Sequence, residues 1–201
     1  VALIRATGHD RVFLVGHDWG AAVAWWVGVK YPELLKRLVI LNVPHPIVMA
    51  RHTRQSVEQI LRSWYIFFFQ IPWLPEIVFR AAGYRFGREI LTASSRPDTF
   101  DVGDLRAYRR AWSRPGALTG MINWYRATRQ TRTERLPSLR VTAPTLILWG
   151  AHDVALSRPL APKSLEMCDD GHLVFIEEAT HWVQHDEPAR VNHLILSFLE
   201  E

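Results

Sequence analysis

Four short apolar runs without polar alternation lie toward the two ends of the chain. They cover residues 12–15, 38–41, 145–149 and 173–176. Continuous apolar runs of this length are typical of parallel strands that are covered on both faces. Residues 21–29 form a longer apolar stretch that ends before Pro32, which predicts a buried helix, and apolar positions at helical spacing over 191–198 predict a closing amphipathic helix. Strands that alternate with helices predict an α/β fold with a mostly parallel sheet.

The pattern changes between about residues 50 and 138, where no strand-like run occurs. Apolar residues recur there at helical spacing, as Ile60, Trp64 and Phe67 do. We therefore expect a helical cap inserted into the sheet domain. The expected division is a first part of the α/β core at 1–49, the helical cap at 50–138 and the second part of the core at 139–201.

Arginines are concentrated in this helical segment. The chain carries 24 lysines and arginines against 20 acidic residues, a net charge of +4, and sixteen of its arginines lie between residues 51 and 140. They alternate with apolar residues at helical spacing, as Arg106 and Arg109 do beside Leu105 and Tyr108, so we interpret them as a solvated helix face. Since no recognised nucleic-acid motif accompanies them, we expect no nucleic-acid partner.

The composition, 48% apolar and 22% charged, is that of a globular protein. The longest apolar stretch, 60–79, contains charged residues and prolines, so no membrane span is predicted. The single cysteine, Cys168, has no partner for an internal disulfide, and the first residues lack the pattern of a secretory signal. These observations predict a cytoplasmic protein.

The segment Gly16-His17-Asp18-Trp19-Gly20 lies between the first predicted strand and the first predicted helix. Small residues at both ends permit a sharp strand-to-helix turn that exposes the central side chain, as in a nucleophile elbow. Asp18 is then a nucleophile; the alternative is that it only caps the helix. A carboxylate that attacks a saturated carbon leaves an ester, which water can hydrolyse. Asp18 therefore points to substrates such as epoxides or alkyl halides.

Hydrolysis of that ester needs a base, and His181 is the candidate that follows the last predicted strand. Asp153 follows the preceding strand, where a carboxylate can orient the imidazole. The alternatives are a structural histidine and a turn-forming aspartate. The order Asp18, Asp153, His181 matches the nucleophile, acid and base order of the α/β-hydrolase fold.

The chain resembles the α/β-hydrolase epoxide hydrolases over its whole length. Gly16-His17-Asp18-Trp19-Gly20-Ala21-Ala22 is similar to their nucleophile motif, and Thr180-His181-Trp182 with Asp186-Glu187-Pro188 to their base segment. Trp64-Tyr65 before Phe69-Gln70-Ile71-Pro72, and Asn123-Trp124-Tyr125-Arg126, resemble the cap segments that carry the family's paired tyrosines. The resemblance implies that Tyr65 and Tyr125 donate hydrogen bonds to the epoxide oxygen. Without this resemblance, the sequence favours each tyrosine as an aromatic residue of the core.

The chain departs from this family at its start, where the expected strands and the loop with the H-G-x-P pattern are missing. We therefore expect an N-terminally truncated sequence, in which the backbone amide of Trp19 is the oxyanion donor that can be placed. A small apolar epoxide and water are the expected reactants, with no metal and no organic cofactor. A haloalkane dehalogenase, in which Trp19 binds halide, and a catalytically silent fragment stay open as alternatives.

Overall fold

The computed structural model describes residues 1–55, 57–128 and 138–200. The chain forms two compact units. The sheet unit comprises Val1–Gln59 and Arg135–Glu201, and the helical unit comprises Ile60–Glu134. Residues 50–59, assigned above to the cap, belong by their contacts to the sheet unit, so the limits of the cap stay a prediction.

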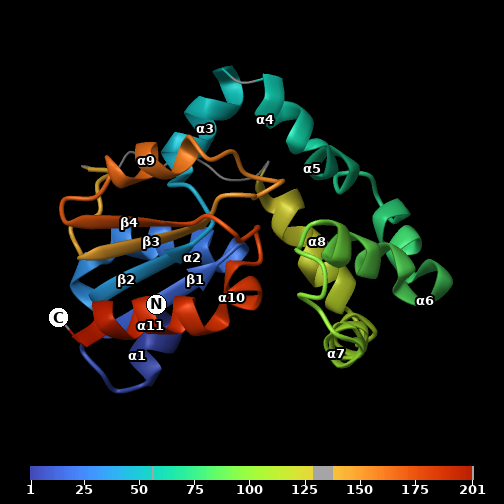
Figure 1. Ribbon diagram of the computed structural model, residues 1–201, viewed down its shortest axis with the longest axis horizontal. Coiled ribbons are helices and arrows are strands. Elements are labelled where there is room, and N and C mark those ends of the chain that lie inside the picture. The colour runs from blue at the N-terminus through green and yellow to red at the C-terminus, as the bar shows by residue number, and fades with distance from the viewer. Residues whose placement is uncertain (56, 129–137, 201) are drawn as a thin grey trace. The chain divides into compact units, whose positions relative to one another are not determined.

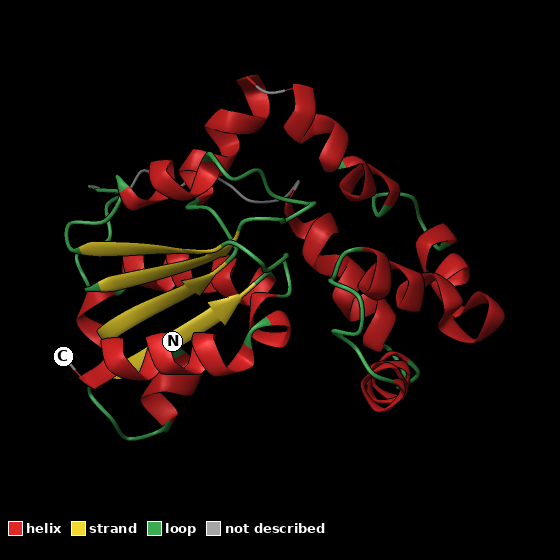
Figure 2. Ribbon diagram, in the orientation of Figure 1, coloured by secondary structure: helices red, strands yellow, loops and turns green. Residues whose placement is uncertain are grey.

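The sheet unit contains a parallel sheet in which the spatial order of the strands is their order in the sequence, β1-β2-β3-β4 (Figures 1 and 2). Its carboxyl ends are in register, since His17 pairs with Leu41 and Leu41 with Leu148. The α/β prediction is thereby confirmed. The strands are β1 (Val12–His17), β2 (Leu35–Leu41), β3 (Thr145–Gly150) and β4 (Gly171–Ile176).

Helices cover the two faces of the central strands. Leu38 and Ile40 of β2 point into one core, with residues of α2 (Trp19–Lys30), α3 (Pro46–Gln55) and α9 (Leu160–Leu165). Val39 and Leu41 point into the other core, with residues of α10 (Val183–Asp186) and α11 (Pro188–Glu200). Every residue of β3 is buried, and removing such an aliphatic side chain from water contributes about 1.5–3 kcal/mol.

The first strand differs from this pattern. Phe13 and Val15 of β1 are 46% and 45% exposed. The expectation of cover on both faces was therefore wrong for β1. The remaining elements of this unit are α1 (Ala2–Ala6) and a 3₁₀ turn (Pro32–Leu34); α4 (Val57–Arg62) spans the boundary between the units.

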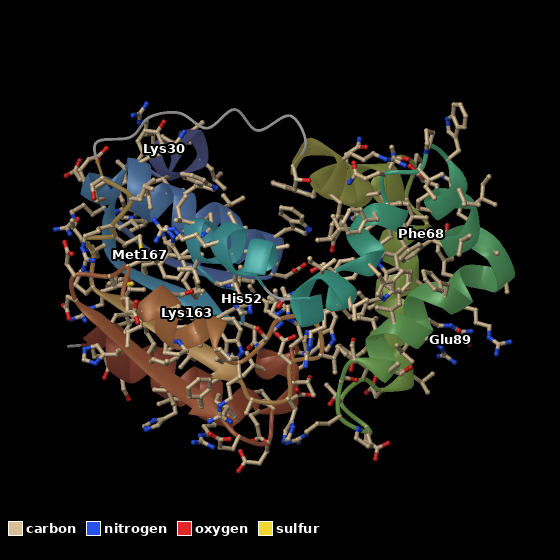
Figure 3. The ribbon with its side chains drawn as sticks, turned by 90° about the horizontal axis from the view of Figure 1, so that it is seen from above. Lys30, His52, Phe68, Glu89, Lys163 and Met167 are labelled. Atoms are coloured by element: carbon tan, nitrogen blue, oxygen red, sulfur yellow. The ribbon has the colours of Figure 1, made fainter. Side chains whose placement is uncertain are left out.

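The helical unit is built around aromatic side chains. The ring of Phe68, labelled in Figure 3, lies 5.7 Å from that of Phe69 and 6.4 Å from that of Phe86. A capping box formed by Asp101 and Asp104 begins α7. The helices are α5 (Trp64–Phe68), α6 (Leu74–Ala93, kinked over residues 81–84), α7 (Val102–Trp112) and α8 (Ala117–Ala127). Across the part of the chain that the structure describes, every helix is too short or too polar to cross a membrane.

Candidate active site

Asp18 occupies the turn between β1 and α2. Its backbone has φ 49° and ψ −128°, a conformation that costs a non-glycine residue about 1–3 kcal/mol. Gly16 makes the turn possible, since a Cβ there would lie 2.6 Å from the carbonyl oxygen of Gly20. A Cβ at Gly20 would meet nothing within 4 Å, so the close approach that requires glycine is at Gly16. The carboxylate of Asp18, with a side chain that is 47% exposed, is accessible.

The histidine and both aspartates predicted from the sequence lie together at the carboxyl edge of the sheet. His181 Nε2 is 3.7 Å from Asp18 Oδ1, an ion-pair distance rather than a hydrogen bond. On the other side of the ring, His181 Nδ1 is 2.8 Å from Asp153 Oδ2. The side chains of His181 and Asp153 are 10% and 1% exposed. The imidazole therefore has one nitrogen fixed by Asp153 and the other directed at Asp18.

Asp153 is held by hydrogen bonds to both carboxylate oxygens. Its Oδ1 accepts from the backbone amides of Ala155 at 2.7 Å and Leu156 at 2.8 Å. Its Oδ2 accepts from Asn42 Nδ2 at 2.9 Å in addition to the contact with His181. Since these donors satisfy the carboxylate on several sides, it has one orientation in which to hold the imidazole.

Asn42 is a residue of the candidate site that the sequence analysis above did not identify. It is fully buried, has φ 53° and follows β2 directly. Its Nδ2 donates to Asp153 and to the carbonyl of Thr180, and its Oδ1 accepts from the amide of Gly150. Its position at the carboxyl end of a parallel strand, where polar residues meet, is the signal by which it could have been found.

The loop that carries His181 is fixed from two sides. His17 Nε2 is 2.8 Å from the carbonyl oxygen of His181, and Gln184 Nε2 donates to His17 Nδ1 at 3.2 Å, so Nε2 of His17 carries the proton. The buried carboxylate of Asp186 accepts from both the amide and the hydroxyl of Thr180. His17, directly before Asp18, and Asp186, five residues after His181, therefore both hold the backbone of the same loop.

Gly150, the last residue of β3, lies against this loop. A Cβ at this position would be 1.9 Å from the carbonyl oxygen of Thr180 and 2.8 Å from that of Ala179. Both neighbours are backbone atoms, so no side-chain rotation relieves the clash. Only glycine lets the strand that precedes Asp153 approach the segment that carries His181.

The charges of the site stabilise an ion pair. Burial lowers the pKa of His181, but Asp153 and then Asp18 outweigh it and raise the pKa to about 10. Desolvation raises the pKa of Asp18, yet the interactions with His181 and the amide of Trp19 hold it below its usual value. Burial and the nearby His181 charge lower the pKa of His17 to about 4. These shifts favour the ionised form of Asp18, the protonated form of His181 and the neutral form of His17.

These shifts predict how stability depends on pH. A pKa of His181 raised from 6.5 to about 10 contributes stability that is fully present below pH 6.5 and is lost as the pH rises through 10. We therefore expect the thermal unfolding temperature to fall between pH 6.5 and 10, and to fall less in His181→Gln, which cannot titrate. Parallel curves for the two proteins over this range would contradict the assignment.

The tyrosines singled out by the resemblance lie side by side in the helical unit. The ring centroids of Tyr65 on α5 and Tyr125 on α8 are 5.7 Å apart at an interplanar angle of 84°. The ring of Phe69 packs on both, at 5.9 Å from Tyr65 and 4.7 Å from Tyr125. Residues 60 positions apart in the sequence therefore form one aromatic pair. Within the described residues, no group of three or more metal-ligating side chains is arranged around a common point.

The α/β hydrolases are defined by a parallel sheet whose carboxyl edge carries, in chain order, a strand-to-helix turn, an acid and a histidine. The sequence model of the alpha/beta hydrolase fold family matches residues 1–188. The chain belongs to this family.

Comparison with individual proteins indicates which hydrolases within this family the chain resembles. It is 42% identical to the AB hydrolase superfamily protein YfhM of Bacillus subtilis, covering 100% of this chain and 70% of that protein. It is 36% identical to human epoxide hydrolase 4, covering 99% of this chain and 56% of that protein. An epoxide hydrolase from Bacillus megaterium superposes with a TM-score of 0.86 at 26% identity, over 99% of this chain and 72% of that one. The resemblance to epoxide hydrolases is confirmed, and the chain is shorter than these proteins.

Proposed function

We propose that this protein hydrolyses an epoxide to a vicinal diol through a covalent ester on Asp18. The observation that carries the proposal is the aspartate in the strand-to-helix turn, 3.7 Å from a histidine that a second aspartate orients. A serine in this position would serve acyl transfer, whereas a carboxylate serves attack on saturated carbon. The epoxide hydrolases among the relatives and the similar structures support the substrate class.

In the first step, a carboxylate oxygen of Asp18 attacks an epoxide carbon and the carbon–oxygen bond of the ring breaks. The epoxide oxygen takes a proton from the tyrosine pair, Tyr65 and Tyr125, which prevents release of a free alkoxide. The proton that restores the phenol comes, in the overall balance, from His181. The products are a hydroxyalkyl ester of Asp18 and a neutral imidazole.

Formation of the ester changes the acidity of His181. The charge of Asp18 and its interaction with the ring are two causes of the raised pKa, and both disappear when the carboxylate is esterified. Asp153 remains, so the neutral imidazole stays oriented and takes a proton from water. The hydroxide attacks the ester carbonyl, and the amide of Trp19 stabilises the oxyanion. The bond between the carbonyl carbon and the substrate oxygen then breaks, and that oxygen takes the second proton of the attacking water, so that the diol leaves and Asp18 is again a carboxylate. One proton therefore passes between His181 and the reactants in each direction.

The test compares the two substrate classes directly. In the full-length protein, Tyr65→Phe and Tyr125→Phe are each expected to lower diol formation from an aryl epoxide by about 10²-fold, the scale of a lost oxyanion donor. Halide release from a bromoalkane, if any, should change far less. Product formation is measured by chromatography and halide by titration.

Tyr108→Phe is the matched control, because Tyr108 belongs to the same unit but packs on Phe100 and Trp112 instead. It is expected to retain diol formation. Full epoxide activity in both single variants of the pair would remove the tyrosines from the mechanism. Halide release without diol formation would identify a dehalogenase, and neither product a silent domain.

A further inference from the structure

Arg126 follows Tyr125 directly and uses every donor of its guanidinium group. Its Nε donates to the carbonyl of Phe69 at 3.1 Å. Its Nη1 donates to Glu76 Oε1 at 2.7 Å and to Asn123 Oδ1 at 3.3 Å. Its Nη2 donates to the carbonyl of Ile71 at 3.1 Å and to Glu76 Oε2 at 3.0 Å. A guanidinium carries five N–H groups, so none is left over.

Two of these acceptors, the carbonyls of Phe69 and Ile71, belong to the segment that follows α5, the helix of Tyr65. Glu76 lies in the next helix, α6, and Asn123 lies in α8 itself. Phe69 also donates its amide to the carbonyl of Tyr65 at 2.9 Å. Arg126, the neighbour of Tyr125 in α8, therefore connects α8 with the turn that ends α5, the helix of Tyr65.

Gln70 makes a second link between the same two helices. Its Nε2 donates to the carbonyl of Tyr125 at 3.0 Å and to that of Ile66, next to Tyr65, at 3.2 Å. Both links join the helices whose tyrosine rings pack on Phe69. Hydrogen bonds to backbone carbonyls therefore connect the two helices in addition to the ring packing.

The carboxylate of Glu76 keeps the guanidinium in place. The side chain of Glu76 is 9% exposed and that of Arg126 is 24% exposed. Both carboxylate oxygens of Glu76 accept hydrogen bonds from the two terminal nitrogens of the guanidinium group. The hydrogen bond from Arg126, acting against desolvation, holds the pKa of Glu76 below its usual range. Such a fork-to-fork pair fixes orientation as well as charge.

We propose that Arg126 is a positioning residue for the tyrosine pair, and that its contacts with the carbonyls of Phe69 and Ile71 serve the opening of the epoxide and not the hydrolysis of the ester. This inference rests on the proposed function. Two hydroxyls must reach one oxygen atom at hydrogen-bond distance, so an error of about 1 Å in the spacing of their helices is costly. A lysine supplies a single charged centre for Glu76 and lacks the planar fork that also reaches both carbonyls.

The experiment therefore uses Arg126→Lys in the full-length protein, with Arg85→Lys as the matched control. Arg85 forms an ion pair with Glu89 on the surface of the same unit, with side chains that are 69% and 57% exposed. We expect Arg126→Lys to unfold near the wild-type temperature and to form the ester about 10- to 100-fold more slowly in single-turnover experiments. The rate of ester hydrolysis should be unchanged, and Arg85→Lys should match the wild type in every measurement.

A double-mutant cycle separates positioning from a loss of structure. In a Tyr125→Phe background, Arg126→Lys is expected to slow ester formation by about two-fold or less, because the hydroxyl that it positions is gone. Full activity of Arg126→Lys, or equal losses in both backgrounds, would overturn the inference. If Arg126→Lys does not fold, the same cycle is measured with Gln70→Met, which removes the second link between the two helices. The same two results, full activity or equal losses in both backgrounds, would then overturn the inference. A wild-type protein that forms no diol overturns the proposed function, and this inference with it, before any variant is compared.

Discussion

The His181→Gln variant is expected to accumulate a covalent ester on Asp18 when it is mixed with a reactive epoxide. Attack on the epoxide needs the carboxylate of Asp18, whereas cleavage of the ester needs a base that glutamine cannot supply. The loss of a general base slows a step by about 10²- to 10⁴-fold, so the ester should become the dominant species. Mass spectrometry of the peptide that contains Asp18 should show a gain of one substrate mass.

Asp18→Asn in the same experiment is the control, since it removes the nucleophile and leaves His181 in place. It should form no adduct and no diol. An Asp18→Asn protein with wild-type turnover, together with an unmodified peptide in His181→Gln, would remove both residues from the mechanism. An adduct found on another residue would reassign the nucleophile and leave the base untouched.

The Gly150→Ala variant is expected to lose both stability and turnover. The added methyl group would lie 1.9 Å from a backbone oxygen of the loop that carries His181, so the loop or the strand must move. Overpacking of this kind costs about 1–3 kcal/mol. A displacement of His181 by about 1 Å would slow turnover by about 10²-fold. Chemical denaturation and the diol assay measure the two effects.

Gly120→Ala serves as the matched control for this substitution. A Cβ at Gly120, inside α8, would meet nothing within 4 Å. Alanine is the better helix former there and should stabilise the protein by about 0.5–1 kcal/mol. If Gly150→Ala behaved in the same way as Gly120→Ala, the close approach would have no role in placing the base.

The sheet and the order of the predicted site residues could be read from the sequence because both are local in the chain. The strands of the buried centre are continuous apolar runs, and Asp18, Asp153 and His181 each follow one of them. The parallel sheet then brings the carboxyl ends together without further information. The exposure of Phe13 was missed because an apolar run does not state which of its faces another element covers.

Contacts between distant positions could not be read in this way. Asn42 reaches a carboxylate 111 residues away, and no periodicity of its own segment reports that bond. The arginines of the helical segment were interpreted as a solvated face, yet Arg126 directs all its donors to protein acceptors. The pairing of Tyr65 with Tyr125 came only from the resemblance, because helical spacing does not distinguish a reactive phenol from a packed one.

Each strand of the sheet is followed by one polar residue of the candidate site: Asp18 after β1, Asn42 after β2, Asp153 after β3 and His181 after β4. The helical unit is inserted in the crossover between β2 and β3, whose paired residues, Leu41 and Leu148, are adjacent whatever the length of the chain between them. The pairing of β2 with β3 therefore does not depend on the length of the insert, which can vary without disturbing the sheet. Exchange of the whole insert would also remove Tyr65 and Tyr125 together with the helices that carry them, so a replacement cap would have to supply two phenols again for the proposed mechanism to operate.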